Sequence, residues 1–588
     1  MDVHVVAEDP IRAAIVAAFD DVDSVTAVDA TPDDLEDATL GVVGHVVGAN
    51  TFEAANDAAR AGGTPWIAVE VGGVGGQAIE EVDAAVTGFS ADTGWFDCLE
   101  ARVDSLYDGG DSAPSAGRAE ARLAGAIAGR ECIRLFSGES PSILGQIREV
   151  PHARRQLLPV PGCADIDAPA ADDIDLTADD SLALEEAVDR VEIAIDNRVG
   201  IVESIGEFES FPAPYYLATV AETTAYSDAT APQQAAGVAV DWNEALMKAV
   251  GEALERYCAG VYRAATFETA AATDLDSTVT PADVVRPADA PAFDPESEAR
   301  WAPGLALESE SSVHIHADLV QFPQPSKTYG DTQPLPSITT GLGLGSSTVD
   351  ALISGLTEVI ERDATMLSWY STFEPLELTI THDHYRTLAR RAKSEGLETT
   401  ALLLTQDVDI PVVGVAVHRP LDDPTPEDEP WPHFAMGSAC GLDANAAAVG
   451  ALEEALQNWM ELRGMGEDEA GAAGGAIGEY GGFPEQAQEF VDATQEIPAA
   501  TVGPDPVPTG AEALEELIER TTAAELSPVA TRLTTPDVHQ LGFEAVRVVV
   551  PGAQPLFTDE PYFGDRAESV PADLGFEPVL EQEFHPYP

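Results

Sequence analysis

The hydrophobic positions in the first 164 residues form two kinds of run, short apolar runs typical of strands and longer amphipathic runs typical of helices. The expected strands are residues 3–6, 40–47 and 66–71, and the expected helices are residues 10–19, 52–61 and 118–136. Because strands and helices alternate along the chain, we predict a parallel or mixed sheet. The glycine-rich stretch 72–76 follows the third strand without GxGxxG spacing, so we interpret it as a tight loop.

The pattern changes after residue 164. Residues 165–186 are rich in Asp and Ala, which predicts a solvated acidic linker. The remaining residues, 187–588, form a second, larger region with both helical and strand-like runs. The sequence therefore predicts a protein of the α/β (α+β) class, with a Rossmann-like N-terminal domain (1–164), a linker (165–186) and a large second domain (187–588).

Three long amphipathic runs predict the main helices of the second domain, at about 242–260, 348–370 and 443–463. An apolar run at 411–419, rich in β-branched residues, predicts a buried strand. The glycine-rich stretch 466–483 predicts a mobile loop.

The three predicted helices share one pattern of positions. Each has an Ala, a Glu seven residues later, and a Glu or Gln three residues further on. The matching residues are Ala245, Glu252 and Glu255, then Ala351, Glu358 and Glu361, then Ala447, Glu454 and Gln457. The copies lie about a hundred residues apart, too far for a solenoid repeat. We therefore expect equivalent helices of one domain, each with a polar face toward a common centre.

The first two helices also carry an arginine at matching positions, Arg256 and Arg362, and the second helix follows a glycine-rich segment. Glu358 and Arg362 lie one turn apart, and Asp350 differs from Glu358 by only about 80° around the helix. One acidic pair would be explained by a solvated helix face. Three copies among Ala, Gly and Leu favour a shared site instead, because buried carboxylates are costly unless cations neutralise them. Mg²⁺, held by carboxylates and phosphate oxygens, is the expected cation.

The composition limits the possible partners and the compartment. The formal net charge is −75, with 45% hydrophobic residues, so the chain can build cores yet lacks the basic patches that nucleic acid requires. Acid spread along the whole length suits a very salty, halophilic cytoplasm. Five cysteines without a CxxC pair predict a reducing compartment. We find no signal peptide and no apolar run of about 18 residues, so we expect a cytoplasmic protein without a membrane span.

Three segments of the N-terminal region carry a first resemblance: TPWIAVEVGG, GWFDCLEARV and LPVPGCADI. They resemble the accessory domains of azoline-forming synthetases, which are similar to ubiquitin-activating enzymes and help to present a peptide substrate. Those domains usually bind structural zinc through two CxxC pairs. Only Cys98 and Cys163 are present here, and two thiolates do not complete a tetrahedral site, so zinc is not expected.

The second region resembles the YcaO superfamily, and within it the azoline-forming, SagD-like cyclodehydratases. The resemblance rests on NEALMKAVGEALERY, TTGLGLGSSTVDALISGLTEVIERDA, GSACGLDANAAAVGALEEALQ and the late VVVPGAQPLF with its Pro-rich terminus. It implies an enzyme that binds Mg-ATP in a fold of its own.

The resemblance also implies roles for individual residues. The implied metal-binding carboxylates are Glu252, Glu255, Asp350, Glu358, Glu361 and Glu454, and the implied nucleotide-binding residues are Ser346, Arg256, Arg362 and Gln457. Two positions depart from the family. Val238 stands where the family often has the Lys of Gly-Lys-Gly, and Gly450 where an Arg is common.

The implied reaction is ATP-dependent cyclodehydration of Cys, Ser or Thr in a ribosomally made precursor peptide to thiazoline or oxazoline. The terminal carboxylate, on Pro588, is implied to act in the active site; a frayed terminus is the structural alternative. A separate leader-binding protein and a flavin dehydrogenase are implied as partners, and a homodimer is left open. Backbone thioamidation and a non-catalytic peptide-binding scaffold remain as alternatives.

Overall fold

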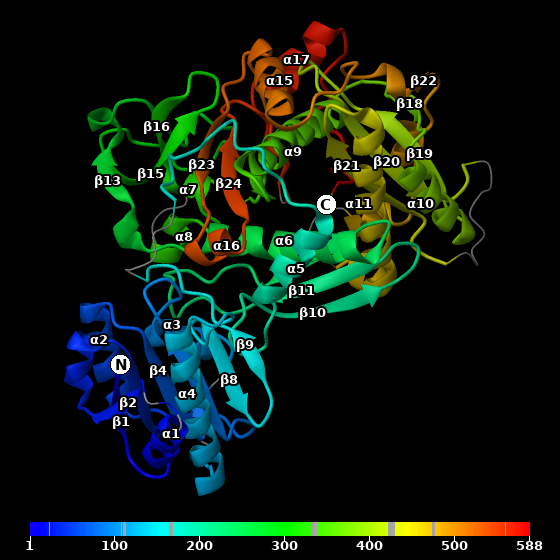
Figure 1. Cartoon of the computed structure of the whole chain (residues 1–588). Coiled ribbons are helices and arrows are strands. Elements are labelled where there is room, and N and C mark those ends of the chain that lie inside the picture. Colours follow the sequence, from blue (N-terminus) through cyan, green and yellow to red (C-terminus); the bar gives the residue numbers. More distant parts are fainter. Residues whose placement is uncertain are drawn as a thin grey trace.

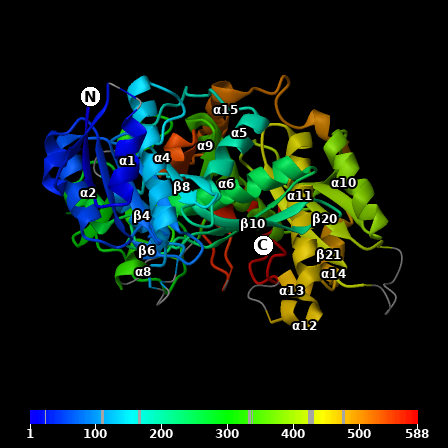
Figure 2. The same cartoon turned by 60° about the horizontal axis from the view of Figure 1, so that its bottom comes forward.

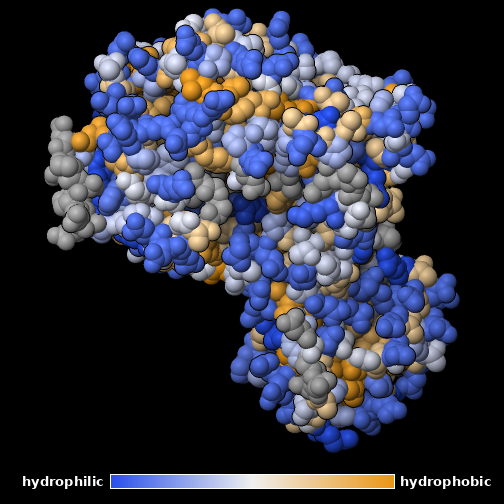
Figure 3. Space-filling model, turned by 180° about the vertical axis from the view of Figure 1, so that it is seen from behind, coloured by the Kyte–Doolittle hydropathy of each residue, from blue (hydrophilic) through white to orange (hydrophobic). Residues whose placement is uncertain are grey.

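The computed structural model describes the whole chain except residues 21, 23, 108, 110–112, 164–168, 331–334, 337, 422–429, 473–476, 559 and 588. The chain folds into two lobes, a smaller N-terminal lobe and a larger lobe above it (Figure 1). Hydrophilic residues cover most of both lobes on the face seen in Figure 3, as the acidic composition requires. No helix within the described ranges combines the length and hydrophobicity needed to cross a bilayer.

A mixed seven-stranded sheet forms the centre of the N-terminal lobe, in the order β2-β1-β3-β4-β7-β8-β9. Its strands are β1 (Asp2–Ala7), β2 (Thr26–Asp29), β3 (Gly41–Val46), β4 (Trp66–Val71), β7 (Ala84–Phe89), β8 (Gln146–Val150) and β9 (Arg154–Gln156). The first four pair in parallel and the others pair antiparallel. The predicted parallel or mixed sheet is confirmed.

Helices cover both faces of this sheet. Alternate residues of a strand point to opposite faces, so Val42 packs with α1 (Ile11–Phe19) and α4 (Arg118–Ser137). Its neighbour Val43 packs with α2 (Thr51–Gly62) and α3 (Phe96–Asp104) on the other face. The expected helices 10–19, 52–61 and 118–136 are thus confirmed as α1, α2 and α4.

The glycine-rich stretch after β4 is a small hairpin of β5 (Gly73–Val74) and β6 (Gln77–Ala78). Gly75 and Gly76 have φ angles of 58° and 75°, a region that favours glycine. Their N–H groups donate to the buried carboxylate of Glu70, at 2.8 and 2.9 Å. The interpretation of this stretch as a tight loop is confirmed.

The larger lobe contains three sheets, each packed on one long helix. The first has the order β10-β11-β12 and packs on α6; the second, β14-β16-β15-β23-β24-β17, packs on α9; the third, β21-β20-β19-β18-β22, packs on α11. The long helices are α6 (Trp242–Gly260), α9 (Thr348–Trp369) and α11 (Ala444–Met465). The three predicted helices are therefore confirmed, with ends within one or two residues of the prediction.

The bounds of the remaining elements complete the description. The strands of the first two sheets are β10 (Val202–Glu209), β11 (Tyr215–Val220), β12 (Gln234–Val238), β13 (Glu268–Ala271), β14 (Thr278–Val279), β15 (Glu298–Ala306), β16 (Ser311–His316), β17 (Leu342–Gly345), β23 (Val529–Arg532) and β24 (Glu544–Val549). The third sheet contains β18 (Leu376–Thr379), β19 (Glu398–Leu403), β20 (Val412–His418), β21 (Phe434–Cys440) and β22 (Glu496–Pro498). The other helices of this lobe are α5 (Leu184–Val191), α7 (Ala317–Val320), α8 (Pro325–Tyr329), α10 (Asp383–Ser394), α12 (Glu467–Ala470), α13 (Ile477–Tyr480), α14 (Glu485–Val491), α15 (Gly510–Ala523), α16 (Pro536–Gln540) and α17 (Arg566–Leu574).

Each long helix begins at a side chain that caps its first turn. Asp241 accepts hydrogen bonds from the N–H groups of the first turn of α6, Ser347 does so for α9 and Asp443 for α11. These caps satisfy backbone donors that have no partner within the helix. Local sequence therefore determines where the three helices begin.

One expectation needs correction. The stretch 466–483 contains α12 and α13, and both Tyr480 and Phe483 are buried in the core, so the prediction of a mobile loop is wrong there; residues 473–476 lie outside the described residues. The described part of the linker is exposed or half-buried, as a solvated linker requires, and hydrogen bonds attach it to the larger lobe. Ala178 accepts a hydrogen bond from the Val349 N–H, and Asp179 accepts one from the Ala511 N–H.

A fully buried ion pair joins the two lobes. Arg102 of α3 pairs with Asp537 of α16, and neither side chain is exposed. Arg102 donates to the Tyr226 hydroxyl at 3.2 Å, and the Tyr257 hydroxyl donates to Asp537 at 2.6 Å. Tyr257 belongs to α6, which lies between the N-terminal lobe and α11 (Figure 2). The N-terminal lobe thus packs directly against one of the three long helices.

Candidate active site

The three long helices line one cavity of about 940 Å³ in the larger lobe. Seven of the candidate residues lie on its wall: Glu252, Glu255, Arg256, Glu358, Arg362, Glu454 and Gln457. They come from α6, α9 and α11 and are brought together from positions up to about two hundred residues apart in the chain. The expected common centre of the three helices is therefore this cavity.

Glycines in the preceding strands allow the close packing that builds the wall. A Cβ added to Gly237 would lie 2.4 Å from the Ala245 carbonyl oxygen, and one added to Gly343 would lie 2.2 Å from the Ala351 carbonyl oxygen. Both distances are clashes, so only glycine lets these strands lie so close to α6 and α9. The alanines at the start of the repeated pattern are the partners in this contact.

Backbone N–H groups orient the acidic side chains. Glu252 accepts a hydrogen bond from the Ala236 N–H at 2.6 Å, and Glu358 accepts one from the Gly341 N–H at 2.8 Å. Glu361 lies behind the wall, where its carboxylate accepts a hydrogen bond from the Ser438 hydroxyl at 2.7 Å. Such bonds hold a carboxylate in one orientation.

The carboxylates are crowded and poorly solvated. Burial, together with the charges of Glu358 and Glu252, raises the pKa of Glu255 to about 8. Burial also raises the pKa of Glu361 to about 7 and raises the pKa of Glu252 and Glu454. Negative charge is unfavourable here unless cations enter, so the donor set suits a hard cation such as Mg²⁺. Among the described residues, no group of three acidic, His or Cys side chains converges on one metal position.

Arg362 provides an unused donor. Its Nη1 is buried and has no hydrogen-bond partner within the described part of the chain. Its ion pairs are long, 3.6 Å to Glu454 and 3.9 Å to Glu361. Because buried donors are normally satisfied, a phosphate oxygen fits this position. Arg256, by contrast, is paired with Glu252 at 2.5 Å.

Ser346 and Asp350 lie outside the cavity lining, at the start of α9. The Ser346 hydroxyl accepts a hydrogen bond from the Leu182 N–H at 2.9 Å and donates to Asp350 at 3.3 Å. The Ser181 hydroxyl also donates to Asp350, at 2.5 Å. The structure therefore brings these two candidates to the segment that precedes α5, and not to the other seven.

The C-terminal segment is packed beside the cavity up to Tyr587; Pro588 lies outside the described residues. The His585 ring N–H donates to the Phe557 carbonyl at 2.7 Å, and the residues on either side of Phe557 line the cavity. His585 and Tyr587 are buried. Burial lowers the pKa of His585 to about 4, so its ring is neutral near pH 7. A frayed terminus is thus wrong for residues 585–587.

Sequence reasoning missed two cations at the site. Lys248 lines the cavity from α6. The sequence feature that could have identified it is the rarity of lysine, because the chain has only three, Lys248, Lys327 and Lys393. Arg547 of β24 is buried, which lowers its pKa to about 10. It donates to the Thr339 and Ile338 carbonyls at 2.7 and 3.1 Å and so orients backbone that lines the cavity. No local pattern marks Arg547.

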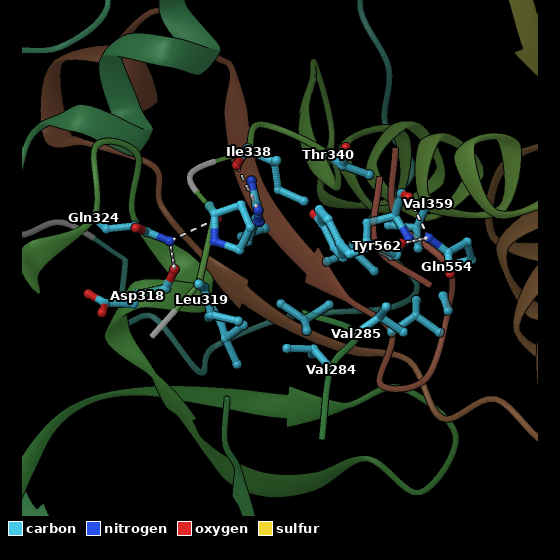
Figure 4. Close-up of a pocket in the computed structure, with 18 residues that line it drawn as sticks. Val284, Val285, Asp318, Leu319, Gln324, Ile338, Thr340, Val359, Gln554 and Tyr562 are labelled. Carbon is cyan, nitrogen blue, oxygen red and sulfur yellow. Dashed lines mark hydrogen bonds between the residues drawn. The ribbon is translucent and has the colours of Figure 1, made fainter. Parts of the chain in front are cut away.

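A smaller pocket of about 90 Å³ lies beside the cavity and shares Ile338 and Thr340 with it. Its wall is mostly apolar, with Val284, Val285 and Val359 facing Tyr562 (Figure 4). The amides of Gln324 and Gln554, also drawn in Figure 4, donate to backbone carbonyls. These two amides are therefore used in holding the fold, whereas Asp318 Oδ2, also on the wall, has no hydrogen-bond partner among the described residues.

The two cysteines of the N-terminal resemblance are neighbours in the structure. Cys98 and Cys163 are both buried and unoxidised, and a hydrogen bond with Cys163 lowers the pKa of the Cys98 thiol. The fold thus brings together the two positions that the resemblance assigns to a zinc site.

Fold and site define a protein in which three strand–helix units surround an acidic cavity. Residues 236–554 match the family model YcaO cyclodehydratase, ATP- and Mg²⁺-binding. This match covers more than half of the chain, and the protein belongs to the YcaO family.

Two relatives match shorter parts of the chain. An uncharacterized protein of Methanothermobacter thermautotrophicus is 29% identical over 238 residues, 40% of this chain and 59% of the relative. An uncharacterized protein from the tfuA 3' region of Rhizobium leguminosarum bv. trifolii is 30% identical over 165 residues, 27% of this chain and 38% of the relative. The matched region thus spans less than two thirds of either relative.

The fold of the whole chain matches two solved heterocyclases. A heterocyclase in complex with substrate and cofactor has a TM-score of 0.73 at 18% identity, covering 100% of this chain and 85% of that chain. The heterocyclase TruD has a TM-score of 0.69 at 17% identity, covering 100% and 84%. Because both matches span the full chain, the N-terminal lobe belongs to the shared fold as well.

Proposed function

We propose that this protein is an ATP- and Mg²⁺-dependent cyclodehydratase that converts Cys, Ser or Thr of a ribosomally made peptide into thiazoline or oxazoline. The observation that carries the proposal is the cavity itself, in which helices from three units of a YcaO domain present carboxylates and Arg362 to one space. An acidic wall with an unused buried arginine donor suits a triphosphate that arrives with magnesium.

Each wall residue takes a role that follows from its chemistry. Glu252, Glu358 and Glu454, one from each helix, are proposed to hold Mg²⁺, and Glu255 and Glu361 to complete the acidic shell. Bound Mg²⁺ neutralises phosphate charge and stabilises the charge that develops as the terminal phosphoryl group moves. Arg362 and Arg256 are proposed to bind phosphate oxygens, with the Gln457 amide as a neutral donor beside them. Ser346 and Asp350 stay candidates only if Ser181 and Leu182 release them.

The reaction requires an activated amide oxygen, because oxide is a poor leaving group. The thiol or hydroxyl of the substrate residue loses its proton to solvent as it adds to the preceding carbonyl carbon, and the amide oxygen takes the terminal phosphoryl group of ATP. Loss of phosphate and of the amide proton then forms the C=N bond of the ring. The products are an azoline, ADP and phosphate, and the removed oxygen atom leaves in the phosphate.

Proton transfer is proposed for the chain terminus. The segment before Pro588 is packed next to residues that line the cavity, through the bond between His585 and the Phe557 carbonyl. The Tyr587 side chain is buried among Glu361, Glu454 and Arg362. We propose that the terminal carboxylate, on Pro588, accepts the proton of the reacting amide.

The test uses the purified protein, Mg-ATP and a Cys-containing precursor peptide, with a separate leader-binding partner added if the peptide alone does not react. Loss of one water mass per ring, with one phosphate released per ring, supports cyclodehydration. Exchange of oxygen for sulfur would indicate thioamidation, and peptide binding without ATP consumption would indicate a scaffold. Either result overturns the proposal.

The setting of this activity is also proposed. A formal charge of −75 is best tolerated at high ionic strength, where screening reduces self-repulsion, so we propose that the enzyme works in a salty cytoplasm. A flavin dehydrogenase, which would oxidise an azoline to an azole, is the proposed downstream partner.

A further inference from the structure

One of the three lysines of this chain lies at the acidic cavity. Lys327 and Lys393 are exposed residues of α8 and α10, away from the cavity lining, whereas Lys248 belongs to the wall. A chain with 104 acidic residues and so few lysines has little need of a lysine for solubility. The position of Lys248 therefore calls for a specific explanation.

Lys248 shares a helix face with the carboxylates of α6. It precedes Glu252 by four residues and Glu255 by seven, and residues so spaced lie on one side of a helix. All three line the cavity. Its side chain is 49% exposed, compared with 28% for Arg256 and 14% for Arg362. Lys248 is thus the most accessible of the three cations on this wall.

The ammonium group is held at one point only. Lys248 pairs with Glu453 of α11, whose side chain is nearly buried, and this is the one partner that the described residues give it. An ammonium group has three N–H donors, so two remain available. The second oxygen of Glu453 accepts a hydrogen bond from the Val240 N–H at 3.0 Å. The positive charge is therefore fixed next to the backbone that follows Val238.

We propose that Lys248 is a phosphate-binding residue, whose ammonium group contacts the outer phosphates of the nucleotide in the cavity. This inference rests on the proposed function, since it assumes a nucleoside triphosphate as ligand. The lysine supplies positive charge from α6, on a wall whose other lining cations among the described residues are Arg256 and Arg362. Glu453 places the ammonium group in the free protein and shares it with the ligand in the complex.

A purely structural role is the competing explanation. The pair of Lys248 and Glu453 joins α6 to α11, and a clamp between these helices would also affect the cavity. The two explanations differ for Glu453. If the pair is only a clamp between the helices, Lys248→Met and Glu453→Gln should weaken nucleotide binding equally. If Lys248 binds phosphate, Lys248→Met removes a cation that the phosphate needs, whereas Glu453→Gln removes an anion that competes with the phosphate for Lys248. The Gln side chain can still accept the hydrogen bond of Val240.

The experiment is calorimetric binding of Mg²⁺ and a non-hydrolysable ATP analogue, in the salt at which the wild type is folded. Lys248→Met should weaken binding about 10- to 100-fold, the range of a charge-assisted hydrogen bond. Lys248→Arg should bind within about threefold of the wild type, and Glu453→Gln should bind at least as tightly. AMP, which lacks the outer phosphates, should bind the wild type and Lys248→Met equally. Lys393→Met is the matched lysine control.

Three results would overturn the inference. Equal weakening by Lys248→Met and Glu453→Gln would indicate a clamp. An unchanged affinity of Lys248→Met for the ATP analogue would exclude a contact between Lys248 and the phosphates. If Lys248→Met weakened the binding of AMP and of the analogue equally, Lys248 would lie away from the outer phosphates. Should Lys248→Met fail to fold, tighter or equal binding by Glu453→Gln still supports the inference and weaker binding still contradicts it. A wild type that binds no analogue would instead refute the proposed function.

Discussion

Glu252 of α6 and Glu454 of α11 are held by the same kind of hydrogen bond, although they belong to different strand–helix units. Each carboxylate accepts a hydrogen bond from a backbone N–H sixteen residues earlier, that of Ala236 at 2.6 Å and that of Ser438 at 2.5 Å. The donors lie in β12 and β21, the strands that precede the two helices. The sequence repeat is therefore also a repeat of side-chain geometry.

This geometry allows a selective test of charge. Glu252→Gln and Glu454→Gln keep an oxygen that can accept the backbone hydrogen bond, but neither can act as an anionic metal ligand. Each should lower kcat/KM for ring formation about 100-fold, the usual scale for losing one group that stabilises transition-state charge. Ring formation is measured by mass spectrometry, with Tm as the check on folding. Glu515→Gln, at an exposed position of α15, is the control, and similar rates for all three variants would contradict the metal role.

Deleting Pro588 moves the terminal carboxylate by one residue, to Tyr587, and keeps the described segment before it. Because His585 and Tyr587 are buried, deletion of residues 585–588 should destabilise the fold as well as affect catalysis. Deletion of Pro588 alone should leave Tm and nucleotide affinity unchanged and lower the rate of ring formation about 100-fold, within the range of general acid–base catalysis. Full activity of this one-residue truncation would remove the terminus from the mechanism.

Glu70 should make the stability of the N-terminal lobe depend on pH. Burial raises its pKa to about 7 from an ordinary value of 4.5, against the opposing effect of the Gly76 and Gly75 hydrogen bonds. A carboxyl group with a raised pKa binds its proton more tightly in the folded state. Its contribution to stability is therefore fully present below pH 4.5 and is lost as pH rises through 7.

Glu70→Gln removes this dependence. The free energy of unfolding of the wild type minus that of Glu70→Gln should fall by about 2 kcal/mol between pH 5 and pH 8. Denaturant melts of both proteins at the two pH values measure it. Glu81→Gln, at an exposed site of the same lobe, is the control for the substitution itself. A constant difference for Glu70→Gln would mean that its carboxyl group ionises normally.

The buried ion pair between the lobes should stabilise the fold more than an ion pair on the surface. Arg102→Met leaves Asp537 buried without its partner, which should lower the free energy of unfolding by about 3–5 kcal/mol. The double variant with Asp537→Leu should recover a large part of this loss. Arg12→Met removes a surface pair with Asp29, whose side chain is 76% exposed, and should lower the free energy of unfolding far less, because exposed charges are well solvated. Equal effects at both sites would contradict the importance of burial.

The sequence predicted the parts of this molecule that depend on local periodicity. The three long helices and strands β1, β3 and β4 of the N-terminal sheet have regular apolar patterns, and the repeated Ala and Glu positions indicated that the helices meet. Strands β8 and β9 were missed because they are short and carry polar residues such as Arg148 and Arg154. These two strands form because neighbouring strands of the sheet pair with them, and the local sequence contains no pattern that predicts this pairing.

Contacts between distant residues could not be predicted in the same way. Arg102 and Asp537 are separated by 435 positions, and no pattern in either segment points to the other. The hydrogen bonds of Ser181 and Leu182 to the start of α9 place Ser346 and Asp350 outside the cavity lining, although the motif grouped them with Glu358. Lys248 could not be assigned to the site from the helix motif, because the motif is defined by carboxylates; only the rarity of lysine in the composition distinguishes it.

A crystal structure with Mg²⁺ and a non-hydrolysable ATP analogue tests the central claim most directly. We predict that the triphosphate occupies the cavity between α6, α9 and α11, with Mg²⁺ bridging its oxygens to carboxylates of Glu252, Glu358 or Glu454 and with Arg362 within hydrogen-bond distance of a phosphate. Nucleotide bound elsewhere on the protein, or Mg²⁺ held without any of these carboxylates, would contradict the account.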